Sequence, residues 1–92
     1  MSVKVRTKSI DAENIFSQSA KLVGYFNLSL SGTWVATVTV QRSFDNSTWL
    51  DVSTFVANTE EYGLEPERDV YYRFGVKTGA FTSGTVVGRL SQ

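Results

Sequence analysis

The stretch SGTWVATVTVQRSFDNSTWLDV, residues 31–52, decides the fold because two strand patterns in it flank a polar turn. Residues 34–41 carry β-branched side chains on both faces, and the stiff χ1 angles of such side chains suit a pleated sheet. One face of this segment is apolar throughout, with Trp34, Ala36, Val38 and Val40. We therefore expect 34–41 to be a strand that places Trp34 in the core and follows a turn at 31–33.

The polar turn at 44–48 and its flanks resemble the Asp-box of sialidase-like propellers, whose pattern is Ser-x-Asp-x-Gly-x-Thr-Trp. The matching residues are Ser43, Asp45, Thr48 and Trp49, with one position missing and the central Gly replaced. The resemblance implies a hairpin stabiliser, and Asp and Asn side chains do mimic backbone turns. We interpret Asp45 and Trp49 as structural residues of a hairpin rather than a sugar site, with Trp49 partly exposed.

Period-two alternation in the rest of the chain predicts an all-β protein. The other alternating segments are 3–8, 22–30, 49–52, 54–57, 70–77 and 85–90. We expect 11–19 to be a connection with at most one helical turn, and the segment TGAFTSG, residues 78–84, to be a turn. We expect the polar segment 58–69 to be a loop that crosses between sheets. About seven short strands at this spacing are typical of an immunoglobulin-like or fibronectin-III-like Greek-key β-sandwich. The 92 residues form one domain, with a strand or arm and connection in 1–21 and the core in 22–92.

The segment LEPERDVYY, residues 64–72, resembles the tyrosine corner of such sandwiches. In that motif a phenol hydroxyl ties the crossing loop to the following strand. Either Tyr71 or Tyr72 could provide the hydroxyl. Tyr72 is in phase with Val70 and Phe74, so we expect Tyr72 to belong to the core.

The composition argues against most kinds of chemistry. The chain has no Cys and no His, so it lacks thiolate ligands, imidazole ligands and the commonest general base. Nine basic and nine acidic residues cancel, which argues against binding of nucleic acid by phosphate neutralisation. No segment approaches the roughly 20 apolar residues of a membrane span, and the N-terminus lacks a signal-peptide pattern. We expect a non-enzymatic protein without cofactor or metal, made in a cytosol and not bound to nucleic acid or membrane.

The charges are unevenly distributed along the chain. Lys4, Arg6 and Lys8 alternate along one segment, and we expect them to form the outward face of its strand. The acidic residues gather far away in the sequence: Glu60, Glu61, Glu65, Glu67 and Asp69. The acidic residues lack the frame of a calcium loop, so we interpret them as a solvated face rather than a cation site. Residues 1–10 could be an arm that contacts another subunit or a lattice, with Lys4, Arg6 and Lys8 against Glu60, Glu61 and Glu65. The alternative is an ordinary first strand.

Two blocks, residues 24–52 and 71–92, resemble small virion structural proteins of tailed bacteriophages. The shared features are a Ser-Gly-Thr-Trp turn, a Val/Thr strand, Gln-Arg-Ser-Phe-Asp, and closing Tyr-Arg and Ser-Gly-Thr-Val segments. The resemblance implies a head decoration (cement) protein that binds phage capsid or other virion proteins, with possible self-association. It implies a place in the virion after assembly in the host cytoplasm, and no catalytic residues.

Two other functions are compatible with the sequence. A phage tail or adaptor module would fit the same resemblance. A carbohydrate-binding module would need exposed coplanar aromatic rings, for which the candidates are Trp49, Tyr25, Tyr62 and Phe81.

Overall fold

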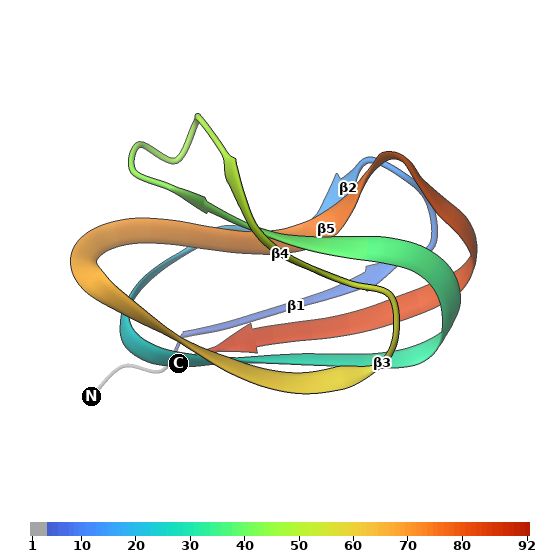
Figure 1. Ribbon diagram of the computed structural model, residues 1–92, viewed down its shortest axis with the longest axis horizontal. Coiled ribbons are helices and arrows are strands. Elements are labelled where there is room, and N and C mark those ends of the chain that lie inside the picture. Colours follow the sequence, from blue (N-terminus) through green and yellow to red (C-terminus); the bar gives the residue numbers. More distant parts are fainter. Residues whose placement is uncertain (1–3) are drawn as a thin grey trace.

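The protein, described by a computed structural model over residues 4–92, is all-β, with 80% strand and no helix. The strands are β1 (Val5–Ile10), β2 (Ile15–Phe16), β3 (Ala20–Ser43), β4 (Leu50–Phe55) and β5 (Thr59–Ser91). They form one open antiparallel sheet in the order β1-β5-β3-β4, with β2 also paired to β5 (Figure 1). None of the described residues forms a helix long and apolar enough to cross a membrane.

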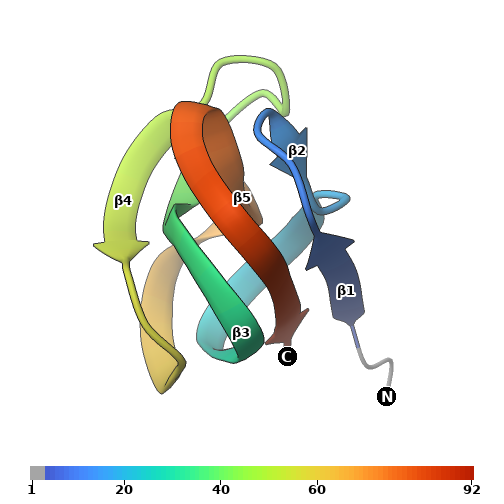
Figure 2. The ribbon, with the colours of Figure 1, turned by 90° about the vertical axis from the view of Figure 1, so that its right-hand side faces the viewer.

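The sheet curls because β3 and β5 are long and pair with each other twice. Residues 27–30 of β3 have 59–62 of β5 on one side and 88–91 of the same strand on the other. Residues 38–43 of β3 pair instead with 71–76 of β5, and 38–42 also pair with β4. We call 5–10, 86–91, 24–30 and 59–65 the β1 half of the sheet, and 71–76, 38–43 and 50–55 the β4 half. The two halves face each other across the interior (Figure 2).

The core lies between these halves. The residues that it buries confirm the alternation expected for the main strands. Its buried apolar side chains come from β1, β3 and β5: Ile10, Ala20, Leu22, Phe26, Leu28, Leu30, Val38, Val40, Val70, Tyr72, Phe74, Val76, Val86 and Leu90. Because Ile10 and Ala20 belong to it, the core includes residues before 22 as well as after.

Both turns expected within the long strands are instead bends in continuous strands. The turn predicted at 31–33 is wrong, since β3 runs through it and Gly32, with φ 99°, pairs with Val86. A Cβ on Gly32 would lie 2.4 Å from the carbonyl oxygen of Thr85, so only glycine permits this close crossing. The turn predicted at 78–84 is likewise part of β5, and the strands predicted at 49–52 and 54–57 are the single strand β4.

The loop predicted at 58–69 is wrong, because 59–65 is a strand of β5 that pairs with 24–30 of β3. An ordinary half-buried strand turns its apolar side chains inward, whereas this strand turns them outward. Gly63 faces the interior, where a Cβ would lie 2.7 Å from the Phe26 ring, while Tyr62 and Leu64 face outward. An interior position filled by glycine leaves no apolar signal in the sequence, which is why the strand was missed.

The N-terminal segment is an ordinary first strand rather than a free arm. β1 pairs with 86–91 of β5 over its whole length, and Ile10 is fully buried. Lys4, Arg6 and Lys8 share the face of Ile10, so the prediction that they form the outward face is wrong. Lys4 and Arg6 donate to the backbone carbonyls of Lys21 and Ser19, which close this side of the interior. Val3, which began the predicted strand, lies outside the described residues.

Candidate interaction surface

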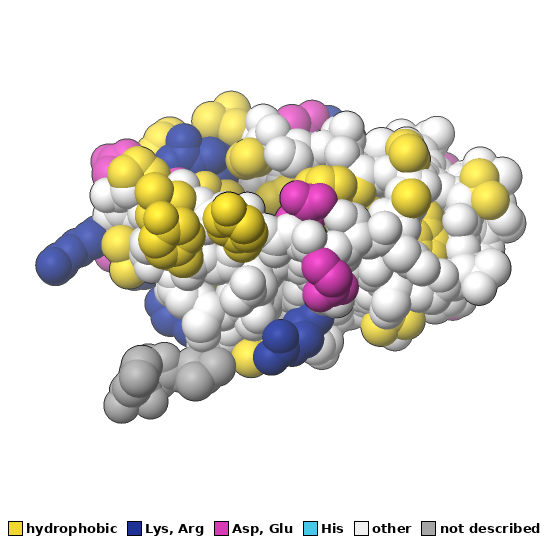
Figure 3. All heavy atoms as spheres, turned by 60° about the horizontal axis from the view of Figure 1, so that its bottom comes forward, with side chains coloured by type: hydrophobic (Ala, Val, Ile, Leu, Met, Phe, Trp, Pro, Cys, Tyr) yellow, Lys and Arg dark blue, Asp and Glu magenta, His cyan; other side chains and the backbone are white. Residues whose placement is uncertain are grey.

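Two neighbouring strands on the outer side of the β1 half together expose four large apolar side chains. Val23 and Tyr25 come from β3, and Tyr62 and Leu64 from the neighbouring part of β5. Tyr25 is 68% exposed and Tyr62 77% exposed, which is unusual for aromatic residues in the middle of strands. Figure 3 shows hydrophobic side chains gathered at one end of this face. We call Val23, Tyr25, Tyr62 and Leu64 the tyrosine patch.

The strand register holds the tyrosine patch together. Tyr25 pairs with Leu64, and Asn27 with Tyr62, so the two tyrosines lie diagonally on adjacent strands. Their ring centroids are 6.3 Å apart, with planes tilted by 52°. The Gln92 side chain braces the strand beneath them, since its amide donates to the carbonyl oxygens of Val23 and Tyr25. The backbone of Val23 and Tyr25 is therefore held by Gln92 on one side and by the pairing with 59–65 on the other.

A shallow apolar groove continues the patch around the edge of the sheet. It has a volume of about 120 Å³ and lies between β4 and residues 61–63 of β5. Phe26, Phe55, Val52 and Tyr62 are among the residues that line it. Tyr62 therefore contributes to both the outer face and the open side of the molecule.

Glu65, predicted to be an exposed interface residue, is 1% exposed, so that prediction is wrong. Its carboxylate forms an ion pair with Arg42. The hydroxyl of Tyr72 donates to Oε1 at 2.8 Å, and the backbone N–H of Glu67 donates to Oε2 at 3.0 Å. Burial of a charge is tolerated when opposite charge and hydrogen bonds satisfy it, as they do here. The hydroxyl thus ties 64–72 together through a side chain.

The buried cluster shifts the acidity of its members. Burial alone would raise the pKa of Glu65, but hydrogen bonds from the Glu67 amide, Tyr72 and Arg42 outweigh burial and lower it. Burial, with the neighbouring Glu65 carboxylate, raises the pKa of Tyr72 to about 12. Both shifts keep Glu65 charged and Tyr72 protonated at neutral pH, which preserves the donor–acceptor pair.

The turn after β3 has the structural role predicted for Asp45. Its Oδ1 accepts hydrogen bonds from the backbone N–H groups of Thr48 at 2.7 Å and Ser47 at 2.9 Å, and from the Ser43 hydroxyl at 2.8 Å. Asn46 adopts the left-handed region, with φ 60°. The amides of Thr48 and Ser47 lower the pKa of Asp45 to about 2. The carboxylate organises the turn.

A stacked arginine on the outer side of the β4 half was not predicted. The guanidinium of Arg73 lies 4.1 Å from the ring centroid of Phe16 and 4.3 Å from that of Trp49. Arg73 Nε donates to Gln41, and Gln41 donates to Asp51, which pairs with Lys77. Burial lowers the pKa of Arg73. The pairing of 38–43 with 71–76 places Gln41 beside Arg73. The sequence alone does not specify that pairing, so it gives no sign of this cluster.

Trp34, expected in the core, packs against the core at its rim and is only partly buried. Its indole N–H donates to the Asn58 side chain at 2.8 Å, and Asn58 in turn donates to the Gly32 carbonyl oxygen at 2.9 Å. An indole that needs a hydrogen-bond partner favours a boundary position over the dry interior.

The remaining candidates do not converge on one site. Within residues 4–92, no three acidic residues are placed to hold a metal ion. Glu60 accepts from Ser29 and Glu61 from Thr59, while Asp69 lies 3.5 Å from Lys21. Of the sugar-binding candidates, Tyr25 and Tyr62 are neighbours but tilted, Trp49 stacks on Arg73, and Phe81 packs against the core.

Comparison with known proteins gives no relative. No family model matches the chain, and neither a curated protein nor a solved structure matches it.

Proposed function

We propose that this chain is a non-enzymatic virion structural protein of a tailed bacteriophage that decorates or cements a capsid. The tyrosine patch is the observation that carries the proposal. Exposed apolar residues gathered on a braced sheet are typical of surfaces that bind another protein, and tyrosine is enriched at interface hot spots. Many copies on a repeating lattice would bind strongly through avidity even if each contact were weak.

The resemblance to virion proteins supports the same proposal. The first block, 24–52, contains most of β3 and the start of β4, and the second block, 71–92, contains the later part of β5. These blocks form one of the two pairings between β3 and β5, that of 27–43 with 71–91. We interpret the curled sheet as a β-sandwich of immunoglobulin type. The bends in β3 and β5 support about seven strand segments, as this topology requires.

The charged residues are consistent with a binding role without catalysis. Glu65 is occupied by Arg42, Tyr72 and the Glu67 amide, and Asp45 by its own turn. The pKa values of Glu65 and Asp45 are shifted by these hydrogen bonds and by the ion pair, and structural networks of this kind often shift pKa values without any catalytic role. We therefore assign these groups to stability and the tyrosine patch to binding.

Co-sedimentation with phage particles tests the proposal. The particles are those of the phage whose genome encodes this chain, assembled without it. We expect the wild-type protein to bind them and Tyr25→Ala to weaken binding at least about tenfold, the effect of losing a modest hot spot. Phe44→Ala is the matched control, because Phe44 is an exposed aromatic residue outside the patch.

Each result bears on a separate part of the proposal. Absence of wild-type binding to the particles would contradict capsid decoration. Equal binding by wild type and Tyr25→Ala would show that the patch is not the contact surface.

The exposed tyrosine pair favours carbohydrate binding as the second candidate function. Stacking on sugar rings would need an accessible aromatic face, which Tyr25 and Tyr62 provide, although their planes are tilted by 52°. A glycan array with tyrosine fluorescence quenching would separate this function from capsid binding, since Tyr25→Ala would then lose a glycan signal.

A further inference from the structure

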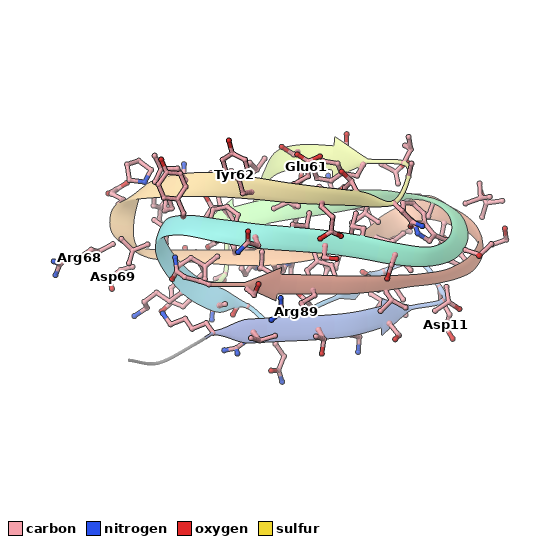
Figure 4. The ribbon with its side chains drawn as sticks, turned by 90° about the horizontal axis from the view of Figure 1, so that it is seen from below. Asp11, Glu61, Tyr62, Arg68, Asp69 and Arg89 are labelled. Atoms are coloured by element: carbon pink, nitrogen blue, oxygen red, sulfur yellow. The ribbon has the colours of Figure 1, made fainter. Side chains whose placement is uncertain are left out.

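The β1 half of the sheet has two edges to which no other strand pairs among the described residues. β1 pairs with 86–91 on one side, and 59–65 pairs with 24–30 on one side, as Figure 4 shows from outside. Glu61 and Tyr62 lie on the second of these edges. An exposed strand edge presents unpaired N–H and C=O groups and is a template for another strand.

The strand directions make the two edges compatible with each other. Every neighbouring pair in the β1 half is antiparallel, in the order 5–10, 86–91, 24–30 and 59–65. The strand 59–65 therefore runs opposite to β1. A second copy placed beside the first in the same orientation brings its β1 next to 59–65 and continues the antiparallel alternation.

The register gives the two edges complementary side chains. Arg6 pairs with Leu90, Leu90 with Leu28, and Leu28 with Glu61, so Arg6 and Glu61 end the same row. The next row runs from Val5 through Ser91 and Asn27 to Tyr62. A copy added in register sets Arg6 opposite Glu61 and Val5 opposite Tyr62. Opposite charges, and an aromatic residue facing a β-branched one, are favourable cross-strand pairs.

The backbone of β1 is also suitably oriented. Lys4 and Gln92 exchange both backbone hydrogen bonds, Lys4 N–H to Gln92 at 3.2 Å and Gln92 N–H to Lys4 at 2.8 Å. Because hydrogen-bonded positions alternate along an antiparallel pair, the N–H and C=O groups of Val5, Thr7 and Ser9 point toward the free edge. Val5 is 36% exposed, and its carbonyl oxygen accepts a hydrogen bond from the Arg6 guanidinium of the same strand at 3.2 Å.

We propose that copies of this chain associate side by side, with β1 of one copy pairing antiparallel with residues 59–65 of the next. The contact is head-to-tail, so it produces a ring if the rotation between copies closes and a filament if it does not. Arg6 with Glu61 sets the register, and Val5 with Tyr62 adds apolar contact. This association shares Tyr62 with the tyrosine patch but needs no virion partner, so it can be tested separately from the proposed capsid binding.

Sedimentation velocity over a concentration series tests the association by exchanging charges. We expect the wild-type protein to form larger species as concentration rises. Arg6→Glu and Glu61→Arg should each weaken association at least about tenfold, because like charges would then face each other. An equal mixture of the two variants, and the double variant in one chain, should restore it.

Two further variants keep the result interpretable. Arg89→Glu makes the same charge change as Arg6→Glu on the middle strand 86–91, so it should associate like wild type. Thr7→Pro removes an N–H that points to the free edge and should abolish association. Thermal unfolding of each variant, followed by circular dichroism, identifies any that fail to fold.

If Arg6→Glu unfolds because Arg6 also bonds Ser19, Glu61→Arg alone decides. Among residues 4–92, the Glu61 carboxylate accepts a hydrogen bond only from the hydroxyl of Thr59, on the same exposed strand. A wild-type protein that stays monomeric up to about 1 mM, where even weak contacts are populated, overturns the proposal. Association that survives both Glu61→Arg and Thr7→Pro in folded protein also overturns it.

Discussion

The hydroxyl of Tyr72 donates a hydrogen bond to the buried carboxylate of Glu65 at 2.8 Å, within the segment that connects the two halves of the sheet. Arg42 supplies the opposite charge from β3, and the Glu67 amide binds the other carboxylate oxygen. A charge that is 1% exposed is tolerated only because these donors surround it. The stability of this corner should therefore depend on each donor.

Tyr72→Phe should lower the free energy of unfolding by about 1.5–3 kcal/mol, the range for a hydrogen bond to a charged group. The ring itself remains, so its contact with Phe26, at 4.7 Å between centroids, is retained. Urea denaturation at pH 7 measures the change. Tyr71→Phe is the matched control on the neighbouring, half-buried tyrosine. Equal stability of the two variants would show that the hydroxyl of Tyr72 contributes nothing.

Tyr72 should also make the fold sensitive to alkali. Its folded-state pKa is raised from 10.0 to about 12 by burial and then by Glu65. A raised pKa contributes stability that is complete below pH 10 and is lost as the pH rises toward 12, because the unfolded chain releases its proton first. Unfolding free energies measured from pH 9 to 12 should fall less steeply for Tyr72→Phe than for wild type. Parallel curves would contradict the assigned shift.

Asp45 should give the opposite dependence at low pH. Its pKa is lowered from 3.8 to about 2, first by the Thr48 amide and then by the Ser47 amide. A lowered pKa contributes stability that is present above pH 3.8 and is lost as the pH falls toward 2. Melting temperatures measured between pH 5 and 2 should decline less for Asp45→Asn than for wild type. Asp11→Asn, an exposed aspartate outside the turn, should decline as wild type does.

Gly88 should tolerate no side chain. A Cβ there would lie 2.2 Å from a ring carbon of Phe74, which is fully buried and cannot move aside freely. Gly88→Ala should therefore lower the free energy of unfolding by about 1–3 kcal/mol, as other overpacking substitutions do. Chemical denaturation provides the measurement, with Val87→Ala as the exposed neighbour for comparison. A change below about 0.5 kcal/mol, as at ordinary surface sites, would show that the interior can adjust.

Local patterns in the sequence determined the strand faces and the turn at Asp45. Alternating apolar residues in 22–30 and 70–76 face the core, because one strand can bury only one face. Asp45 accepts hydrogen bonds from amides two and three residues away, so its own segment supplies its partners. The absence of Cys and His likewise follows from the sequence alone and limits the available chemistry.

Only the tertiary structure decided the positions that depend on distant partners. Glu65 is buried because Arg42, 23 residues away, supplies its counter-charge, and no local pattern distinguishes it from the exposed Glu61. Gly63 faces the interior because the Phe26 ring fills the space in front of it. Arg6 and Glu61 end the same row because two long strands pair with each other twice. Burial and register are properties of pairs of segments, so residues far apart in the chain acquire them only when the sheet forms.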